Sequence, residues 1–295
     1  MQTVGFVPPA VVYTALTVIL VIYALFFLAQ SSYFLSAFAS LKPEGYTYAD
    51  YARKGFFELC RVAAINAVLV LFSELLIQRT PKSGVPDTAP DKTAGTSKPP
   101  AGLRVYNILM GLSTLILIAV AAAKLYLYIE NYGLTPARVN AAWFLLLLAS
   151  AFIFLIIRQL APKFNFWRAC TAAFVVLFAV LAFSNTDTLI AKYNIARFYD
   201  GSLPTVDVEL FASLSNAALP ELADLLDRDE ASGGTLLDDE TRDWASRYLE
   251  QILEATEMHR QNNKVSLTER INHALGYNAS RAAIDNLLES GKYRK

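Results

Sequence analysis

Long apolar runs separated by short polar segments dominate the first two thirds of the chain. Five of these runs reach the length of about 20 apolar residues that a helix needs to cross a hydrocarbon core. They are residues 8–34, 56–77, 105–126, 137–160 and 166–183. The pattern therefore predicts an all-α fold. It consists of a polytopic membrane helix bundle with about five transmembrane helices over residues 1–185 and a soluble helical tail over residues 186–295.

Several polar and turn residues predict where single helices begin and end. The helix of the third span is expected to continue beyond the span to about Asn131 and to stop at Gly133, and Thr135-Pro136 is expected to start the next helix. In the tail, one of the residues Asn185 to Asp187 is expected to cap a helix that runs to about Tyr199. The leucine spacing predicts one helix over Val208–Arg228. Residues 79–102 are rich in Pro, Gly, Ser, Thr and Lys, so we expect a disordered loop there.

Composition agrees with a membrane protein and excludes several classes of site. The 295 residues are 55% apolar, with a mean hydropathy of +0.35. Residues 1–185 hold 14 Lys and Arg against 7 Asp and Glu, whereas residues 186–295 hold 12 against 19. The acidic tail argues against a nucleic-acid partner. The two cysteines lie in apolar runs and the two histidines stand apart, so no metal site, cofactor or catalytic residue is predicted.

Five crossings determine which connections share a face of the membrane. The connection 39–53, the turn 127–136 and the tail lie on one face. The loop 79–102 and the turn 161–165 lie on the other. Eight Lys and Arg lie near span ends on the loop face, against seven on the tail face. In a cell (inner) membrane, the positive-inside rule then favours a cytoplasmic loop and an outside tail by one residue.

The tail face also gathers the charged residues that lie nearest to the spans. Lys54, Glu58 and Arg61 are spaced i, i+4 and i+7, so a helix places them on one stripe. A charge at depth costs roughly 2.5–3.5 kcal/mol and is usually paired, snorkelled or functional. Either Glu58 and Arg61 pair with each other, or they join a polar patch with other helices. The candidate polar patch comprises Arg53, Lys54, Glu58, Arg61, Lys124, Glu130 and Arg138.

Three stretches together resemble a known family: Tyr48–Leu59 (YADYARKGFFEL), Lys124–Arg138 (KLYLYIENYGLTPAR) and Asn185–Arg197 (NTDTLIAKYNIAR). They are similar to a bacterial multi-pass membrane family known only as domain of unknown function 4173, and to its relative, number 4153. Members often carry further spans before this region, so the resemblance implies that the chain corresponds to a C-terminal half. It implies the membrane architecture and no established activity.

Three functions are consistent with the sequence, which leaves open whether the protein is an enzyme. The favoured one is a membrane scaffold or sensor, embedded in the lipid bilayer, whose tail binds a protein partner or a second copy in a homo-oligomer. A transporter or channel subunit would use the polar residues of the second and third spans. A membrane-surface enzyme acting on envelope or lipid-linked substrates would use Glu58, Glu130 and Asp50 as acid or base groups.

Overall fold

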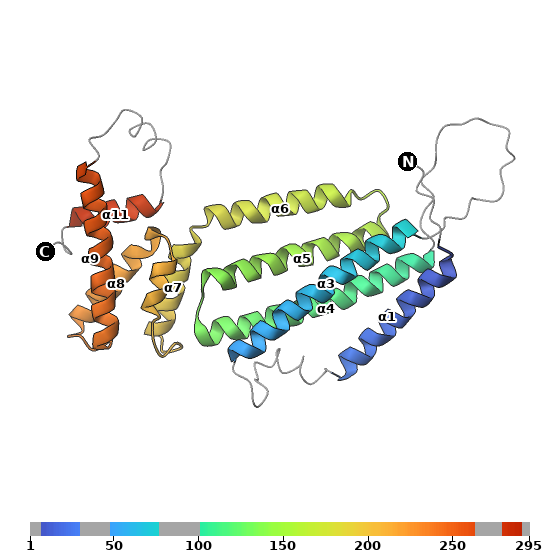
Figure 1. The fold of residues 1–295 in the computed structure, drawn as a ribbon, viewed down its shortest axis with the longest axis horizontal. Helices are drawn as coiled ribbons and strands as arrows, with labels where there is room; N and C mark the ends of the chain where they lie inside the picture. Colours follow the sequence, from blue (N-terminus) through green and yellow to red (C-terminus); the bar gives the residue numbers. More distant parts are fainter. Residues whose placement is uncertain (1–6, 30–47, 77–100, 263–278, 291–295) are drawn as a thin grey trace. The chain divides into compact units, whose positions relative to one another are not determined.

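The computed structural model describes residues 7–29, 48–76, 101–262 and 279–290, and these residues are mostly helical (Figure 1). Along the chain the elements are α1 (Pro9–Ala29), α3 (Tyr48–Leu76), α4 (Ala101–Tyr132), α5 (Pro136–Leu160), α6 (Phe166–Phe183), α7 (Thr186–Tyr199), the 3₁₀ helices η1 (Val208–Ser213) and η2 (Asn216–Ala218), α8 (Leu219–Ala231), α9 (Asp239–Asn262) and α11 (Ala279–Ser290). The all-α fold class is confirmed.

Four of the described helices, α1, α4, α5 and α6, have the length and apolar composition to cross a membrane. The expected span 56–77 falls within α3 as far as Leu76, and its crossing of the membrane stays a prediction. Most of the expected loop 79–102 lies outside the described residues, as does the end of the first expected span beyond Ala29.

The chain divides into two compact units. The first comprises Met1–Tyr128 and Ala142–Leu177, and the second comprises Ile129–Ala141 and Phe178–Lys295. The turn between α4 and α5 therefore belongs to the same unit as the tail. This assignment places the last turn of α4 and the first turn of α5 beside the tail helices.

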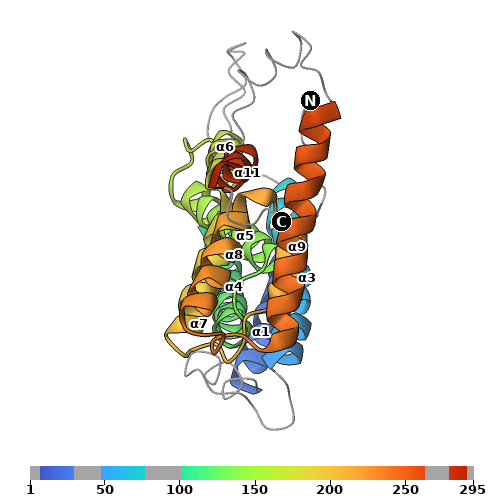
Figure 2. The ribbon, with the colours of Figure 1, turned by 90° about the vertical axis from the view of Figure 1, so that its left-hand side faces the viewer.

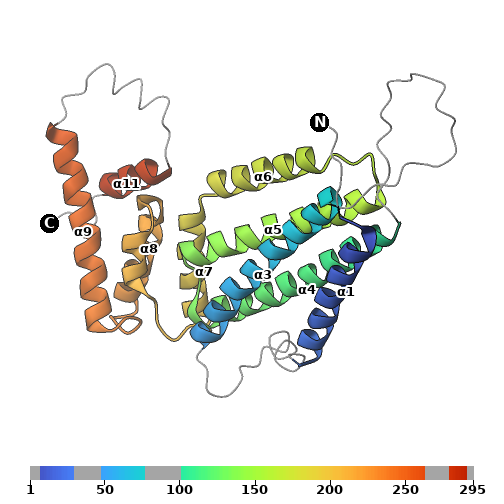
Figure 3. The same cartoon turned by 45° about the vertical axis from the view of Figure 1, so that its right-hand side comes forward.

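Helix α4 is the centre of the first unit, where α3 runs alongside it (Figures 1 and 3). Half of its most apolar stretch is buried within the protein, compared with 6% for α6. On α1, Thr17 Oγ1 lies 2.7 Å from the Tyr106 hydroxyl of α4, and the rings of Tyr13 and Tyr106 stack. Helix α5 approaches closely at Gly111, where a Cβ atom would lie 2.8 Å from Ile156 Cγ1.

The second unit has its own apolar core, to which each described tail helix contributes. Helices α8 and α9 lie in the foreground of Figure 2. The buried core includes Ile190, Ala191, Ile195, Phe211, Leu219, Leu222, Leu225, Ala245, Leu249 and Ile284. Leu134 and Val139, from the α4–α5 turn and the start of α5, pack against it. The tail is therefore a folded helical unit that includes this turn.

Two helix boundaries are as predicted. Helix α4 ends at Tyr132, and Gly133 follows with a φ of +75°, a left-handed conformation that glycine adopts without a Cβ penalty. Pro136 is the first residue of α5. A proline is favourable there because the first N–H of a helix has no partner within it.

One prediction about the tail was wrong, and a second was correct for the position of the cap but not for its hydrogen bond. The single helix over Val208–Arg228 is divided into η1, η2 and α8, because Leu214 is extended and Pro220 lies in the first turn of a new helix. Asn185 precedes α7, as expected, but its side chain makes no capping hydrogen bond. It adopts a left-handed conformation (φ 48°, ψ 51°) that asparagine tolerates, and so it turns the chain from α6 into α7.

Candidate functional site

The contact between α3 and α4 follows a heptad pattern. On α4, every side chain in the series Leu103, Asn107, Met110, Thr114, Leu117, Ala121 and Lys124 is at most 2% exposed. The series alternates steps of four and three residues, as does the buried series Leu59, Ala63, Asn66, Val70 and Ser73 on α3. This spacing is typical of helices that pack along a narrow line with a small crossing angle. We call these twelve residues the α3–α4 seam.

Polar side chains pair across the α3–α4 seam. Asn66 Nδ2 donates a hydrogen bond to Thr114 Oγ1 at 2.8 Å, and Ser73 Oγ donates one to Asn107 Oδ1 at 3.0 Å. Advancing seven residues on α3 thus retreats seven on α4, as antiparallel helices require. Tyr23 of α1 donates a hydrogen bond to Asn66 Oδ1 at 2.5 Å. In an apolar surrounding, such pairs stabilise helix association by about 0.6–2 kcal/mol each.

Lys124 occupies an apolar position of the α3–α4 seam. It follows Leu103, Met110 and Leu117 at intervals of seven residues, and only 2% of it is exposed. The same antiparallel register brings α3 near Glu58 to the level of Lys124, and Glu58 attracts the Lys124 ammonium electrostatically. A buried lysine in an apolar helix is costly, so its position is a candidate functional feature.

The remaining patch residues of α3 lie at the same end of that helix. Arg53 and Lys54 are in its first two turns, before Glu58. Glu58 and Arg61 are exposed side chains one turn apart. The backbone of α3 therefore puts these residues at one end of the helix, and the joining of the patch side chains stays a proposal.

Arg138 has a structural role at the end of α4. Its Nη1 donates hydrogen bonds to the carbonyl oxygens of Tyr132 (2.7 Å) and Gly133. A cation there stabilises carbonyl groups that have no partner within the helix. The guanidinium also lies 5.9 Å from the centre of the Tyr132 ring. Glu130, half-buried in the last turn of α4, belongs with Arg138 to the second unit.

Asn194 of α7 ties the α4–α5 turn to the tail, a contact that sequence reasoning missed. Its Oδ1 accepts a hydrogen bond from the Leu134 N–H at 2.6 Å, and its Nδ2 donates one to the Leu134 carbonyl at 2.8 Å. A Cβ atom on Gly133 would lie 2.5 Å from Asn194 Oδ1. The two sides of this contact come from two of the motif stretches, Lys124–Arg138 and Asn185–Arg197.

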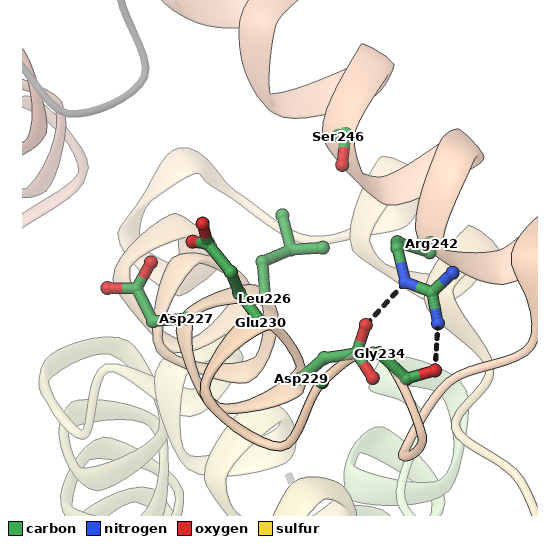
Figure 4. A pocket seen from close by; sticks show the side chains of 8 residues that line it. Leu226, Asp227, Asp229, Glu230, Gly234, Arg242 and Ser246 are labelled. Carbon is green, nitrogen blue, oxygen red and sulfur yellow. Dashed lines mark hydrogen bonds and ion pairs between the residues drawn. The ribbon is translucent and has the colours of Figure 1, made fainter.

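A cavity of about 430 Å³ lies between α8 and the start of α9 (Figure 4). Arg242 spans it: Nε donates to Asp229 Oδ2 at 2.5 Å, and Nη2 donates to the carbonyl oxygens of Gly234 and Leu237 at 2.7 Å each. Asp229 Oδ1 also accepts hydrogen bonds from the N–H groups of Leu236 and Leu237, both at 2.9 Å. We call Asp229 and Arg242 the α8–α9 clamp.

Electrostatics agree with a structural role for the α8–α9 clamp. Burial alone would raise the pKa of Asp229, but the hydrogen bonds from Arg242, Leu237 and Leu236 outweigh it and hold that pKa below its ordinary value. The hydrogen bonds to Asp229 and Asp239 raise the pKa of Arg242. Because the clamp's donors and acceptors satisfy one another, the cavity contributes no evidence for a ligand.

Comparison with known proteins supports the resemblance seen in the motifs. A family model described as "Domain of unknown function (DUF4153)" matches residues 2–85 and 92–225. These ranges contain all three motif stretches. The number 4173 and a bacterial source stay predictions. No curated protein and no solved structure matches the chain.

Proposed function

The chain belongs to the DUF4153 family, whose description names no activity, and we propose that it is a membrane scaffold or sensor whose acidic tail unit binds a protein partner. The apolar helices and the family membership characterise it as a membrane protein of unknown activity. One observation carries the finer proposal. The α4–α5 turn is built into the core of the tail unit through Leu134, Val139 and Asn194.

Helix α4 is a continuous connection between this turn and the α3–α4 seam. It runs without interruption from Ala101 to Tyr132 and carries Lys124 eight residues before its end. A shift of α4 along the seam would therefore displace Gly133 and Leu134, which Asn194 holds against α7. Such an arrangement suits a protein in which the membrane helices and a binding unit influence each other.

The charge of the tail suggests the chemistry of the partner. Residues 219–262, which contain α8 and α9, hold twelve Asp and Glu against four Lys and Arg. A surface of this charge attracts basic protein surfaces and increases their association rates. We propose a basic protein partner, on the outer side of the membrane if the tail lies there.

The test is crosslinking in intact cells from a photoreactive residue at Gln251, an exposed position on α9. The proposal predicts an adduct with a second protein species that disappears when Glu240→Lys and Glu254→Lys reverse two exposed charges of α9. Glu209→Lys, an exposed reversal on η1, is the matched control and should preserve the adduct. Adducts that survive reversal on α9 would contradict an electrostatic partner site, and adducts with a second copy alone would indicate a homo-oligomer.

A transporter or channel subunit is the second candidate, favoured by the burial of Lys124 within an apolar helix. Against it, Asn66, Thr114 and Tyr23 hydrogen-bond with one another, and the described apolar helices are unbroken, whereas transport sites are often built at broken helices. A Lys124→Met variant separates the two functions. A transporter should lose its activity, whereas a scaffold should keep the crosslink from Gln251.

A further inference from the structure

Three buried polar side chains form a layer near one end of the first unit. Ser73, Asn107 and Gln159 come from α3, α4 and α5, and each is at most 6% exposed. Ser73 donates a hydrogen bond to Asn107. Gly111 lies against Ile156, so the antiparallel register of α4 and α5 puts Gln159 at the level of Asn107. The three side chains therefore share one depth.

This layer lies close to the ends of the helices that carry it. Asn107 comes six residues after Ala101, the first residue of α4, or about 9 Å along the axis at a rise of 1.5 Å per residue. Gln159 is the residue before the end of α5 at Leu160. For helices that cross a bilayer, this depth corresponds to the boundary between the hydrocarbon core and the headgroups.

Two buried donors, one in this layer and one three residues before it on α4, lack acceptors among the described residues. Asn107 Nδ2 and Arg104 Nε are both buried, and neither has a hydrogen-bond partner in the structure as described. The two residues are three apart on α4 and so share a face. Side chains in a helix lean towards its N-terminus, so the Asn107 amide leans towards Arg104. Leaving such donors without a partner costs about 1–3 kcal/mol for each group.

The groups near the start of α4 share one property: each of them donates hydrogen bonds and accepts none. Arg104 offers a permanent cation with donors only, and Asn107 Nδ2 is a donor. The first turn of the 32-residue helix α4 adds backbone N–H groups with no partner within the helix and the positive end of the helix dipole. This set is complementary to an anion with several oxygen acceptors, such as a phosphate group.

We propose that Arg104, Asn107 and the first turn of α4 bind the phosphate of an anionic phospholipid. We favour a lipid over a free ion as the source of the phosphate, because the depth of the site along the helices corresponds to the level of the headgroup phosphates. By the expected topology this leaflet is on the loop face, opposite the tail unit. The site is therefore independent of the proposed partner surface on α9.

The test uses the purified full chain, delipidated in detergent and titrated with phosphatidylglycerol while bound lipid is counted by native mass spectrometry. The wild-type protein should retain phosphatidylglycerol, and Arg104→Gln should weaken this binding about tenfold, as expected for the loss of a charged hydrogen bond. Arg168→Gln is the matched control. Arg168 is an exposed arginine at the start of α6, where the chain enters the same face, and its replacement should leave binding unchanged.

A second variant separates loss of lipid binding from loss of folding. Asn107→Asp keeps an oxygen to accept the Ser73 hydrogen bond and supplies Arg104 with an internal carboxylate. It should lose phosphatidylglycerol binding while its melting temperature stays equal or rises. The proposal would be overturned if Arg104→Gln and Arg168→Gln bound phosphatidylglycerol equally well. It would also be overturned if Asn107→Asp bound this lipid as well as the wild type does. Inorganic phosphate that displaces the lipid at equal concentration would overturn the lipid as the source and indicate a site for the free ion.

Discussion

The side-chain amide of Asn194 makes two hydrogen bonds with the backbone of Leu134. Its Oδ1 accepts one from the Leu134 N–H at 2.6 Å, and its Nδ2 donates one to the Leu134 carbonyl at 2.8 Å. The two residues are 60 positions apart in the sequence. One belongs to the turn between two apolar helices, and the other to the first helix of the tail. This pair makes the turn part of the tail unit, and the proposed scaffold function depends on it.

Replacing Asn194 by alanine should release the turn. Both hydrogen bonds to Leu134 are lost, at a cost of about 2 kcal/mol, so the Leu134 amide should exchange with solvent roughly 30-fold faster. Hydrogen–deuterium exchange of the purified full chain measures this rate. Lys192→Ala is the control on the same helix, because Lys192 is exposed and its 3.5 Å contact with Glu221 is a surface ion pair. Equal exchange in both variants would show that Asn194 does not hold the turn.

Two glycines with the same backbone conformation should respond differently to alanine. Gly133 and Gly201 have φ values of +75° and +77°. Both substitutions carry the cost of a left-handed alanine, about 1 kcal/mol. Only at Gly133 would the new Cβ collide with a side chain, 2.5 Å from Asn194 Oδ1, since nothing lies within 4 Å at Gly201. Thermal unfolding should therefore show a clearly larger loss of stability for Gly133→Ala, and equal losses would argue against close packing at Asn194.

The α8–α9 clamp should make the tail sensitive to acid. The pKa of Asp229 is lowered in the folded protein, so its contribution to the free energy of unfolding is fully present above its unfolded pKa of about 3.9. This contribution is lost as the pH falls below that value and through the folded pKa. Asp229→Asn should cost about 3 kcal/mol at pH 7 and flatten the dependence of the melting temperature on pH below about 4.

Asp239→Asn is the control for the α8–α9 clamp. Asp239 also contacts Arg242, with Oδ1 2.7 Å from Nη1, but its carboxylate is fully exposed. Its replacement should leave both the stability at pH 7 and the acid transition close to those of the wild type. A steep acid transition that persists in Asp229→Asn would place the responsible carboxylate elsewhere.

Lys124 tests whether a charge in the α3–α4 seam serves stability or function. Replacing a buried ion by an apolar residue of similar length is often neutral or stabilising by about 1–4 kcal/mol. We therefore expect Lys124→Met to keep or raise the melting temperature in detergent, whereas Glu58→Gln alone should lower it. In the double variant the effect of Glu58→Gln should vanish, because the attraction that it removes is already absent.

Leu117→Met, one heptad before Lys124, controls for the change of side-chain shape and should cost less than about 1.5 kcal/mol. A melting temperature of Lys124→Met that falls as far as expected for a cavity in the core would contradict a costly buried charge in the seam. So would a Glu58→Gln variant with an unchanged melting temperature.

Local signals in the sequence predicted the helices well. The expected span 166–183 has the limits of α6, and Gly133 and Pro136 mark the end of one helix and the start of the next. These features depend on an apolar run or on the backbone preferences of single residues. The break within Val208–Arg228 was missed because leucine spacing alone does not show that a new helix begins at Leu219, with Pro220 in its first turn.

Contacts between segments far apart in the sequence could not be predicted from these local signals. Asn66 meets Thr114 across 48 residues, and such pairs depend on the register between two helices. The sequence did contain one signal of the buried contact line. Asn107, Thr114 and Lys124 of α4 belong to one series of buried positions that alternates steps of four and three residues. The charges near the span ends predicted a patch that includes Glu58 and Lys124, and the antiparallel register of α3 and α4 brings these two residues to a similar level. The charges did not reveal that Arg138 closes the end of α4.

The predicted path of the chain through the membrane puts the tail unit on one face and residues 79–102 on the other. The direct measurement is labelling by an impermeant maleimide of single cysteines at Ser232 or Ser83, after Cys60 and Cys170 have been replaced by serine. We expect one site to react in intact cells and the other only after lysis. Ser232 reacting first would place the tail outside. Both sites reacting in intact cells, or both only after lysis, would contradict an odd number of crossings between them.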